Sequence, residues 1–184
     1  MGEAEYRAGQ IFAWLCKGAE SFDEMRNVPL ALRQKLEAEY SIGVFKTLCV
    51  QTSKLDGTGK YLFELADGNA IESVFMKYKY GNTICVSSQA GCRMGCKFCA
   101  STLGGLCRDL TPGEMIEQLL AAQRDTGEKI NHIVIMGSGE PFDNYENVSS
   151  FLRIVTDPAG LGLGMRNITV STLSLIHISE PTRH

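Results

Sequence analysis

Large apolar residues in the first forty positions recur at helical spacing. Between residues 6 and 15 they fall at i, i+1, i+3 and i+4, and Gly18 follows where such a helix would end. Pro29 then stands where the first turn of a second helix tolerates proline. Residues 5–40 are therefore predicted to be helical.

From about residue 43 the chain becomes rich in β-branched and aromatic residues, in short runs separated by glycine-containing turns. The predicted strands are Val44–Gln51, Tyr61–Leu65, Ala70–Met76 and Thr83–Ser87, with turns at Asp56-Gly57, Asp67-Gly68 and Gly81-Asn82. This pattern indicates a small antiparallel meander.

From residue 111 onward, helix and strand patterns alternate. Thr111, Pro112 and Glu114 have the order of an N-cap, a first-turn proline and a capping-box glutamate, and Gly127 marks the expected end of that helix. The elements that follow are an apolar strand at Ile130–Met136, a helix at Asn144–Thr156 and a strand at Asn167–Thr172. Because a β–α–β–α–β order requires right-handed crossovers, we predict an α/β sheet or barrel with its site at the carboxyl ends of the strands.

Composition limits the class of protein. The chain has 184 residues, of which 44% are hydrophobic and 21% charged, as is typical of a globular protein with a sizeable core. No apolar run reaches the roughly 20 residues that cross a bilayer, and the N-terminus lacks a secretory signal, so we expect a cytoplasmic location without membrane contact. The net charge of −3 carries no polybasic signature of nucleic-acid binding.

Cysteines provide the first chemical signal. The chain has seven, an odd number that does not suggest a disulfide framework, and five of them lie between residues 85 and 107. Cys92, Cys96 and Cys99 have the spacing C-x3-C-x2-C. Three thiolates can hold three irons of a four-iron cluster and leave the fourth iron open for substrate, by the logic of catalytic metal sites. The expected occupant is the amino and carboxylate end of S-adenosylmethionine.

Other uses of these cysteines stay open. A zinc site prefers paired thiols such as two C-x2-C units, which three closely spaced thiols fit poorly. Cys85 or Cys107 could supply a fourth ligand. In a different functional class, the chain would be a non-enzymatic zinc or iron–sulfur module.

A second candidate site follows the apolar strand, in the segment Met136-Gly137-Ser138-Gly139-Glu140-Pro141. Glycines here would let the backbone approach a ligand closely, and a carboxylate at the carboxyl end of a strand can bind an ammonium group. The alternative is a glycine-rich turn with Glu140 in solvent. Its position one βα unit after a three-cysteine loop favours a functional role.

These motifs and their flanks resemble a known family. A C-x3-C-x2-C motif followed by a Gly-Glu-Pro turn resembles the radical S-adenosylmethionine superfamily. The segments Thr83–Cys92, Phe98–Thr102 and Met136–Pro141 are similar to those of the dual-specificity 23S rRNA and tRNA adenine-C2 methyltransferases, and Tyr6–Met25 is similar to the N-terminal helical domain of that family. The resemblance extends to about Thr172.

The resemblance implies a radical-SAM partial (β/α)6 barrel and a two-stage methyl transfer. One S-adenosylmethionine methylates a cysteine in the C-terminal part of such enzymes. A second is cleaved at a [4Fe-4S] cluster, and the resulting radical activates that methyl group for attack on C2 of adenine in 23S rRNA or tRNA. A flavodoxin-like electron donor and a monomeric enzyme are also implied.

The resemblance assigns individual residues as well. The implied cluster ligands are Cys92, Cys96 and Cys99, and the implied S-adenosylmethionine contacts are Gly139, Glu140 and Ser171. Cys85 matches the cysteine that resolves the protein–RNA adduct through a transient disulfide, and Glu72 matches the proton acceptor.

The resemblance stops after Thr172. Residues 173–184 look like the translation of a sequencing adapter, so we expect a non-native tail and a truncated barrel without the methyl-carrying cysteine. The adenine-C8 rRNA methyltransferases share the same constellation and stay an alternative, although residues 83–102 favour C2. The expected organisation is a helical accessory domain at 1–42, a β-meander at 43–80, the first half of the barrel at 81–172 and the tail at 173–184.

Overall fold

The computed structural model describes residues 3–173, so the expected tail, apart from Leu173, lies outside the described residues. The helices are α1 (Tyr6–Cys16), α2 (Leu30–Glu39), α3 (Pro112–Thr126) and α4 (Tyr145–Thr156). The strands are β1 (Lys46–Thr52), β2 (Gly59–Glu64), β3 (Ala70–Tyr78), β4 (Gly81–Val86), β5 (Gln89–Gly91), β6 (Leu106–Asp109), β7 (Ile130–Ile135) and β8 (Ile168–Val170). Short 3-10 turns are η1 (Phe22–Glu24), η2 (Ala100–Thr102) and η3 (Met165–Asn167).

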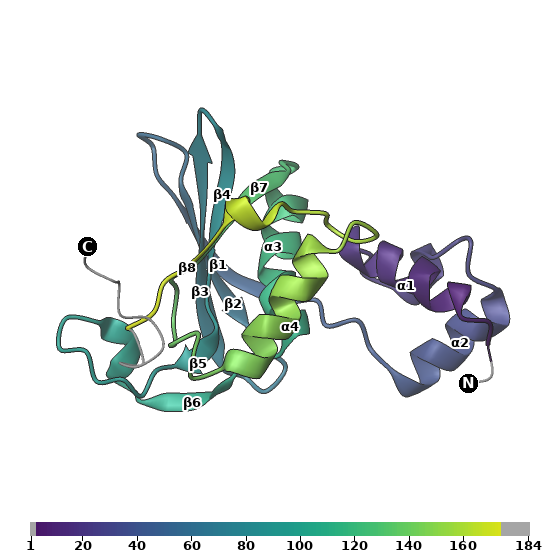
Figure 1. The fold of residues 1–184 in the computed structure, drawn as a ribbon, viewed down its shortest axis with the longest axis horizontal. Coiled ribbons are helices and arrows are strands. Elements are labelled where there is room, and N and C mark those ends of the chain that lie inside the picture. The colour runs from purple at the N-terminus through teal and green to yellow at the C-terminus, as the bar shows by residue number, and fades with distance from the viewer. Residues whose placement is uncertain (1–2, 174–184) are drawn as a thin grey trace, which may run out of the picture.

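The first two helices form a small unit beside the sheet (Figure 1). Their own apolar cluster includes Phe22, Met25 and Leu32, all buried. Pro29 is the N-cap of α2 and not its first helical residue, a shift of one position from the expectation. An ion pair of 2.7 Å between Glu20 Oε1 and the Nε of Arg124 ties this unit to α3.

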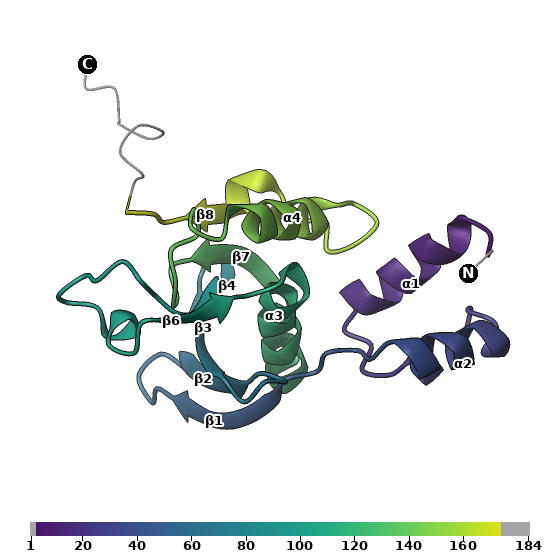
Figure 2. The same ribbon diagram turned by 90° about the horizontal axis from the view of Figure 1, so that it is seen from below.

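Six strands form one curled sheet in the order β1-β2-β3-β4-β7-β8 (Figure 2). Strands β1 to β4 pair antiparallel, whereas β4–β7 and β7–β8 pair parallel. The predicted meander and the first barrel strands are therefore continuous, because β4 belongs to both. This arrangement confirms the predicted α/β class with the first part of a barrel.

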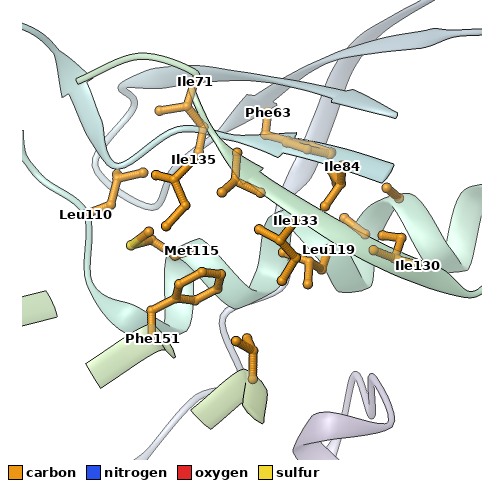
Figure 3. Packing of buried hydrophobic residues seen from close by; sticks show 14 of the residues in the cluster. Phe63, Ile71, Ile84, Leu110, Met115, Leu119, Ile130, Ile133, Ile135 and Phe151 are labelled. Carbon is orange, nitrogen blue, oxygen red and sulfur yellow. The ribbon is translucent and has the colours of Figure 1, made fainter. Parts of the chain in front are cut away.

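The core lies between this sheet and the helices α3 and α4 (Figures 1 and 3). It contains Phe63 and Ile84 from the sheet and Leu119 and Phe151 from the helices, each at most 1% exposed. The start of α3 is as predicted, since the Thr111 hydroxyl accepts the Glu114 N–H at 3.2 Å and the Glu114 carboxylate returns to the Thr111 N–H at 2.9 Å. Gly127, with φ of 67°, ends the helix.

Two details differ from the sequence prediction. The turn between β3 and β4 is Lys79-Tyr80, since Tyr78 pairs with Gly81, and the expected turn residues Gly81-Asn82 already belong to β4. An unpredicted second sheet pairs β5 with β6 around the cysteine region. No helix among residues 3–173 is long and apolar enough to cross a membrane.

Candidate active site

The cysteine motif sits on a loop with a narrow neck. Strands β5 and β6 pair at its base, and the N–H of Cys92 donates to the carbonyl of Gly105 at 3.0 Å. Gly91 has φ of 77°, and a Cβ there would lie 2.0 Å from the Gly105 oxygen. Only glycine therefore allows the two ends of the loop to approach this closely.

The three thiols lie at different depths on that loop. Cys92 is buried, while Cys96 and Cys99 are half-buried and joined by a turn in which the Cys99 N–H donates to the Cys96 carbonyl at 3.0 Å. Within residues 3–173, no three histidine, cysteine or carboxylate side chains are arranged to hold a metal ion. The donor set itself fits a three-thiolate cluster, because all three thiols occupy one short loop fixed at both ends. Cys107 is exposed on β6.

The glycine-rich turn after β7 packs directly against the chain that leads into the cysteine loop. Gly139 has φ of 105°, and a Cβ there would lie 2.6 Å from the Cβ of Gln89 and 2.7 Å from the Oγ of Ser88. The Ser138 carbonyl accepts hydrogen bonds from the N–H groups of Ser88 and Gln89 at 2.9 and 3.1 Å. Gly139 thus has a packing role in addition to any contact with a ligand.

Glu140 joins the ends of two parallel strands. Its side chain is 4% exposed, and its Oε1 accepts hydrogen bonds from the Phe142 N–H at 3.0 Å and the Thr172 hydroxyl at 2.5 Å. Its Oε2 accepts the Leu173 N–H at 2.9 Å. The neighbouring Ser171 is exposed and donates its N–H to the Ile135 carbonyl at 3.1 Å. The turn after β7 and the segment after β8 therefore converge on one carboxylate.

A residue that sequence reasoning missed, Gln89, connects these parts. Its side chain is 0% exposed; its Oε1 accepts the Glu140 N–H at 2.9 Å, and its Nε2 donates to carboxylates of Asp109 and Asp143 at 2.8 and 2.9 Å. A glutamine between Ser88 and Ala90 looks like an ordinary loop residue. Its role depends on partners far along the chain, which no local pattern reveals.

Further contacts hold the first residues of the cysteine loop. Arg93 forms a two-point ion pair with Asp143, and the guanidinium keeps the pKa of that carboxyl below its usual range. The buried Asn144 donates to the carbonyls of Ser88 and Leu110 at 2.8 and 2.9 Å. The segment at 143–144, just after the Gly-Glu turn, thus fixes both ends of the region from β5 to β6.

Buried polar contacts also fix the carboxyl end of β4. The fully buried Gln118 of α3 accepts the Ser87 N–H at 2.8 Å, donates to the Ser87 carbonyl at 3.0 Å and accepts the Ser73 hydroxyl at 2.6 Å. The Ser87 hydroxyl donates to the Glu72 carbonyl at 2.7 Å. Ser73 therefore points toward the helices, and Glu72, its neighbour in β3, points to the other face of the sheet.

Glu72 and Cys85 share that other face. Cys85 pairs with Val74, which is two residues after Glu72, and side chains opposite each other in a ladder lie on one face. Glu72 is exposed and forms an ion pair of 2.6 Å with Lys60. Burial raises the pKa of the Cys85 thiol, so it is protonated at neutral pH.

An apolar cavity of about 1130 Å³ lies elsewhere, between the α1–α2 unit and the body of the protein. Its walls include Phe12, Leu36, Phe45 and Leu120, and neither the cysteine motif nor the Gly-Glu turn lines it. The cavity is therefore separate from the candidate site.

Comparisons with known proteins match both parts of the chain. Residues 86–177 match the family described as the Radical SAM superfamily, and residues 1–42 match the Ribosomal RNA large subunit methyltransferase N-terminal domain. A Lachnospira eligens protein named "Probable dual-specificity RNA methyltransferase RlmN" is 52% identical over 177 residues, which is 96% of this chain and 51% of that protein. A Pelotomaculum thermopropionicum protein of the same name is 56% identical over 177 residues, which is 96% and 48%.

A solved structure is similar to this chain in both fold and sequence. The crystal structure of a radical SAM methyltransferase from Sphaerobacter thermophilus aligns with a TM-score of 0.85 and 42% identity, covering 93% of this chain and 51% of that one. The chain spans about half the length of the curated relatives it matches.

Proposed function

Because the chain belongs to the radical SAM superfamily, we propose that it forms part of an S-adenosylmethionine-dependent RNA methyltransferase. The proposed reaction is methylation of C2 of adenine in 23S rRNA and tRNA, in the cytoplasm, by a monomeric enzyme. Relatives that are 52% and 56% identical and carry the name of a dual-specificity RNA methyltransferase support an RNA substrate. In this proposal, residues 1–42 are an accessory domain, 43–80 a meander, 81–172 the first half of the barrel, and 173–184 a non-native tail.

The observation that carries the proposal is the convergence of three segments at the carboxyl ends of β4, β7 and β8. Gln89 links the start of the cysteine loop to the backbone of Glu140, and the carboxylate of Glu140 binds the segment that follows β8. Sites in parallel α/β folds form where such carboxyl ends meet. The segment that leads into the three-thiol loop is thus linked to the turn that carries the anionic group.

Cys92, Cys96 and Cys99 would hold a [4Fe-4S] cluster, which would supply the one-electron cleavage of S-adenosylmethionine when it is reduced by a flavodoxin-like donor. Residues around the loop position these thiols. The β5–β6 neck fixes both ends of the loop, and the Arg93–Asp143 ion pair holds its first residues. The turn between Cys96 and Cys99 keeps the last two ligands adjacent.

Gly139, Glu140 and Ser171 would bind S-adenosylmethionine. A carboxylate has about four acceptor positions, and the described residues use both positions of Oε1 but only one of Oε2 in Glu140. Among residues 3–173, one acceptor position of Oε2 is therefore left for a bond from an ammonium group. Ser171 is exposed beside it, on the segment after β8.

Glu72 and Cys85 would take part in the steps that involve the RNA substrate. Both lie on the sheet face that α3 and α4 leave uncovered, and Cys85 begins as a protonated thiol because burial raises its pKa. An exposed carboxylate such as Glu72 can take the C2 proton of the adenine in the protein–RNA adduct. Cys85, after losing its own proton, can then attack the sulfur that links the protein to the RNA: an S–S bond forms, the C–S bond breaks, and the released carbon takes its electron pair and a proton to become the methyl group.

RNA methylation by a completed chain tests the proposal. A chimera would join residues 1–172 to the matching second half of the Lachnospira eligens relative, and would be purified without oxygen. It would be incubated with 23S rRNA, tRNA, S-adenosylmethionine and a reductant, and modified adenines would be mapped by mass spectrometry. The expected result is methylation at C2 in both RNAs.

Two results would contradict the proposal. Methylation at C8 would assign the chain to the alternative position on adenine. A chimera that cleaves S-adenosylmethionine but methylates neither RNA would remove the RNA substrate while leaving the superfamily membership intact.

A further inference from the structure

Three aromatic rings gather at the end of the sheet opposite the cysteine loop. Tyr78 and Tyr80 stack with ring centres 5.0 Å apart and planes inclined by 7°, and His132 meets Tyr80 edge-on at 5.4 Å. Tyr80 is 69% exposed and Tyr78 is 46% exposed. The β3–β4 hairpin that carries the tyrosines ends far from β5 and β6 (Figure 1). We name Tyr78, Tyr80 and His132 the aromatic group.

The hairpin turn between β3 and β4 does not require an aromatic residue such as Tyr80. Tyr78 pairs with Gly81, so Lys79 and Tyr80 form a two-residue hairpin turn, a position where asparagine, aspartate and glycine are favoured. A large exposed aromatic side chain in such a turn breaks the local preference. Departures of this kind in a native sequence concentrate at functional sites.

The surroundings are positively charged, although the chain as a whole is negative. Residues 77–82 and 128–132 contain three lysines, Lys77, Lys79 and Lys129, against one carboxylate, Glu128. Glu128 pairs with Lys77 at 3.1 Å, and Lys79 forms no ion pair with any described residue. A positive surplus next to exposed aromatic rings is complementary to a nucleic acid, in which anionic phosphates alternate with flat bases.

The aromatic group lies on the sheet face that carries the proposed RNA-facing residues. Tyr78 follows Glu72 by six positions in β3, and His132 pairs with Thr83, which is two positions before Cys85 in β4. Six strand positions correspond to about 20 Å. Stacked nucleotides advance about 3.4 Å each, so roughly six of them would span this distance.

From these observations we propose that the aromatic group, together with Lys79, binds unpaired nucleotides of the RNA substrate at a distance from the reacting adenine. Tyr80 stacks on a base, and the Lys79 ammonium contacts a neighbouring phosphate. This inference rests on the proposed function, because it takes the partner to be RNA. It adds a substrate-binding surface at the end of the sheet away from the chemistry.

RNA binding by the 184-residue chain tests the surface. The probe is a fluorescein-labelled RNA hairpin with an unpaired loop, and the readout is fluorescence anisotropy across a salt series. Tyr80→Leu should weaken binding about tenfold or more, since one stacked base contributes this much to affinity. Tyr80→Phe should bind like the parent chain because stacking needs the ring and not the hydroxyl. Lys79→Gln should reduce the salt dependence by about one phosphate contact.

Tyr40→Leu is the matched control, because Tyr40 is 58% exposed but follows α2, away from the hairpin. It should leave binding unchanged, and thermal unfolding of each variant reports whether it folds. Equal binding by Tyr80→Leu and the parent chain would overturn the proposal, as would an equal loss in Tyr40→Leu. Absence of RNA binding by the parent chain would also overturn the proposal. The aromatic group would then be a candidate surface for binding another protein. Methylation of RNA by the chimera described above would in each case leave the proposed function standing.

Discussion

Replacing Gln89 with leucine is the sharpest perturbation of the candidate site. Leucine has a volume similar to that of glutamine and is common in protein interiors, so the change removes three hydrogen bonds without creating a large cavity. The partners that lose a bond are the N–H of Glu140 and the carboxylates of Asp109 and Asp143. The variant therefore removes the side-chain link between the start of the cysteine loop and the Gly-Glu turn, while the backbone bonds from Ser88 and Gln89 to Ser138 and every proposed ligand stay in place.

The loss of folding free energy depends on which hydrogen-bond partners the three groups keep in the variant. A buried N–H without an acceptor costs about 1–3 kcal/mol, and Glu140 is buried. Asp143 keeps its ion pair with Arg93, and Asp109 is exposed to water, so these two bonds together add only about 1 kcal/mol. The expected loss is about 2–4 kcal/mol, which lowers the melting temperature of a chain of this size by roughly 5–15 °C.

The assay is thermal unfolding followed by circular dichroism, together with equilibrium dialysis of S-adenosylmethionine against the iron-loaded protein. Gln89→Leu should unfold at a lower temperature and bind S-adenosylmethionine more weakly, because the Glu140 N–H loses its acceptor and the turn is held less firmly. Gln51→Leu, at an exposed position on β1, should change neither property. Gln89→Glu would place a third carboxylate beside Asp109 and Asp143, so its deficit should shrink as the pH falls and the carboxylates are protonated.

A Gln89→Leu chain with the parent melting temperature and the parent affinity for S-adenosylmethionine would refute the positioning role of Gln89. A loss that is equally large in Gln51→Leu would show that the effect is not specific to the site.

Two further predictions concern single side chains. Glu140→Gln should weaken S-adenosylmethionine binding about ten- to hundredfold while iron content is retained, since a neutral amide loses a charge-assisted bond to an ammonium group; unchanged affinity in equilibrium dialysis would reduce Glu140 to a structural link between β7 and β8. Because burial raises the pKa of the Cys85 thiol, the thiolate forms only as the pH rises well above neutral, so alkylation of Cys85 by iodoacetamide should lag behind that of the exposed Cys49 and accelerate in alkaline solution. Equal labelling of both cysteines near neutral pH, measured by peptide mass spectrometry, would contradict this.

Local chemistry in the sequence predicts α3 and β7 well. Thr111, Pro112 and Glu114 specify the start of the helix through contacts within four residues, and Gly127 ends it through its own φ. The apolar run from Ile130 indicates a parallel strand, and the structure forms β7 there, with Ile133 and Ile135 buried on one face and the central residues of the other face half-buried. Such signals depend on neighbours in sequence, so no knowledge of the tertiary structure is needed.

The neck of the cysteine loop could not be predicted in this way. β5 is only three residues long, with Ala90 and Gly91 favouring no strand, and its partner β6 begins fifteen positions after it ends. The pairing depends on Gly91 passing close to Gly105 and on Gln89 finding carboxylates up to 54 residues away. The cysteine spacing indicated what the loop binds, but only the fold shows what holds the loop in place.

The most direct test of the central claim is the metal content of the 184-residue chain purified without oxygen and reconstituted with iron and sulfide. About four irons and four acid-labile sulfides per chain are expected, with loss of the cluster in Cys92→Ala, Cys96→Ala and Cys99→Ala and retention in Cys107→Ala. Stoichiometric zinc without iron or sulfide, or a cluster that survives Cys96→Ala but not Cys107→Ala, would contradict the account.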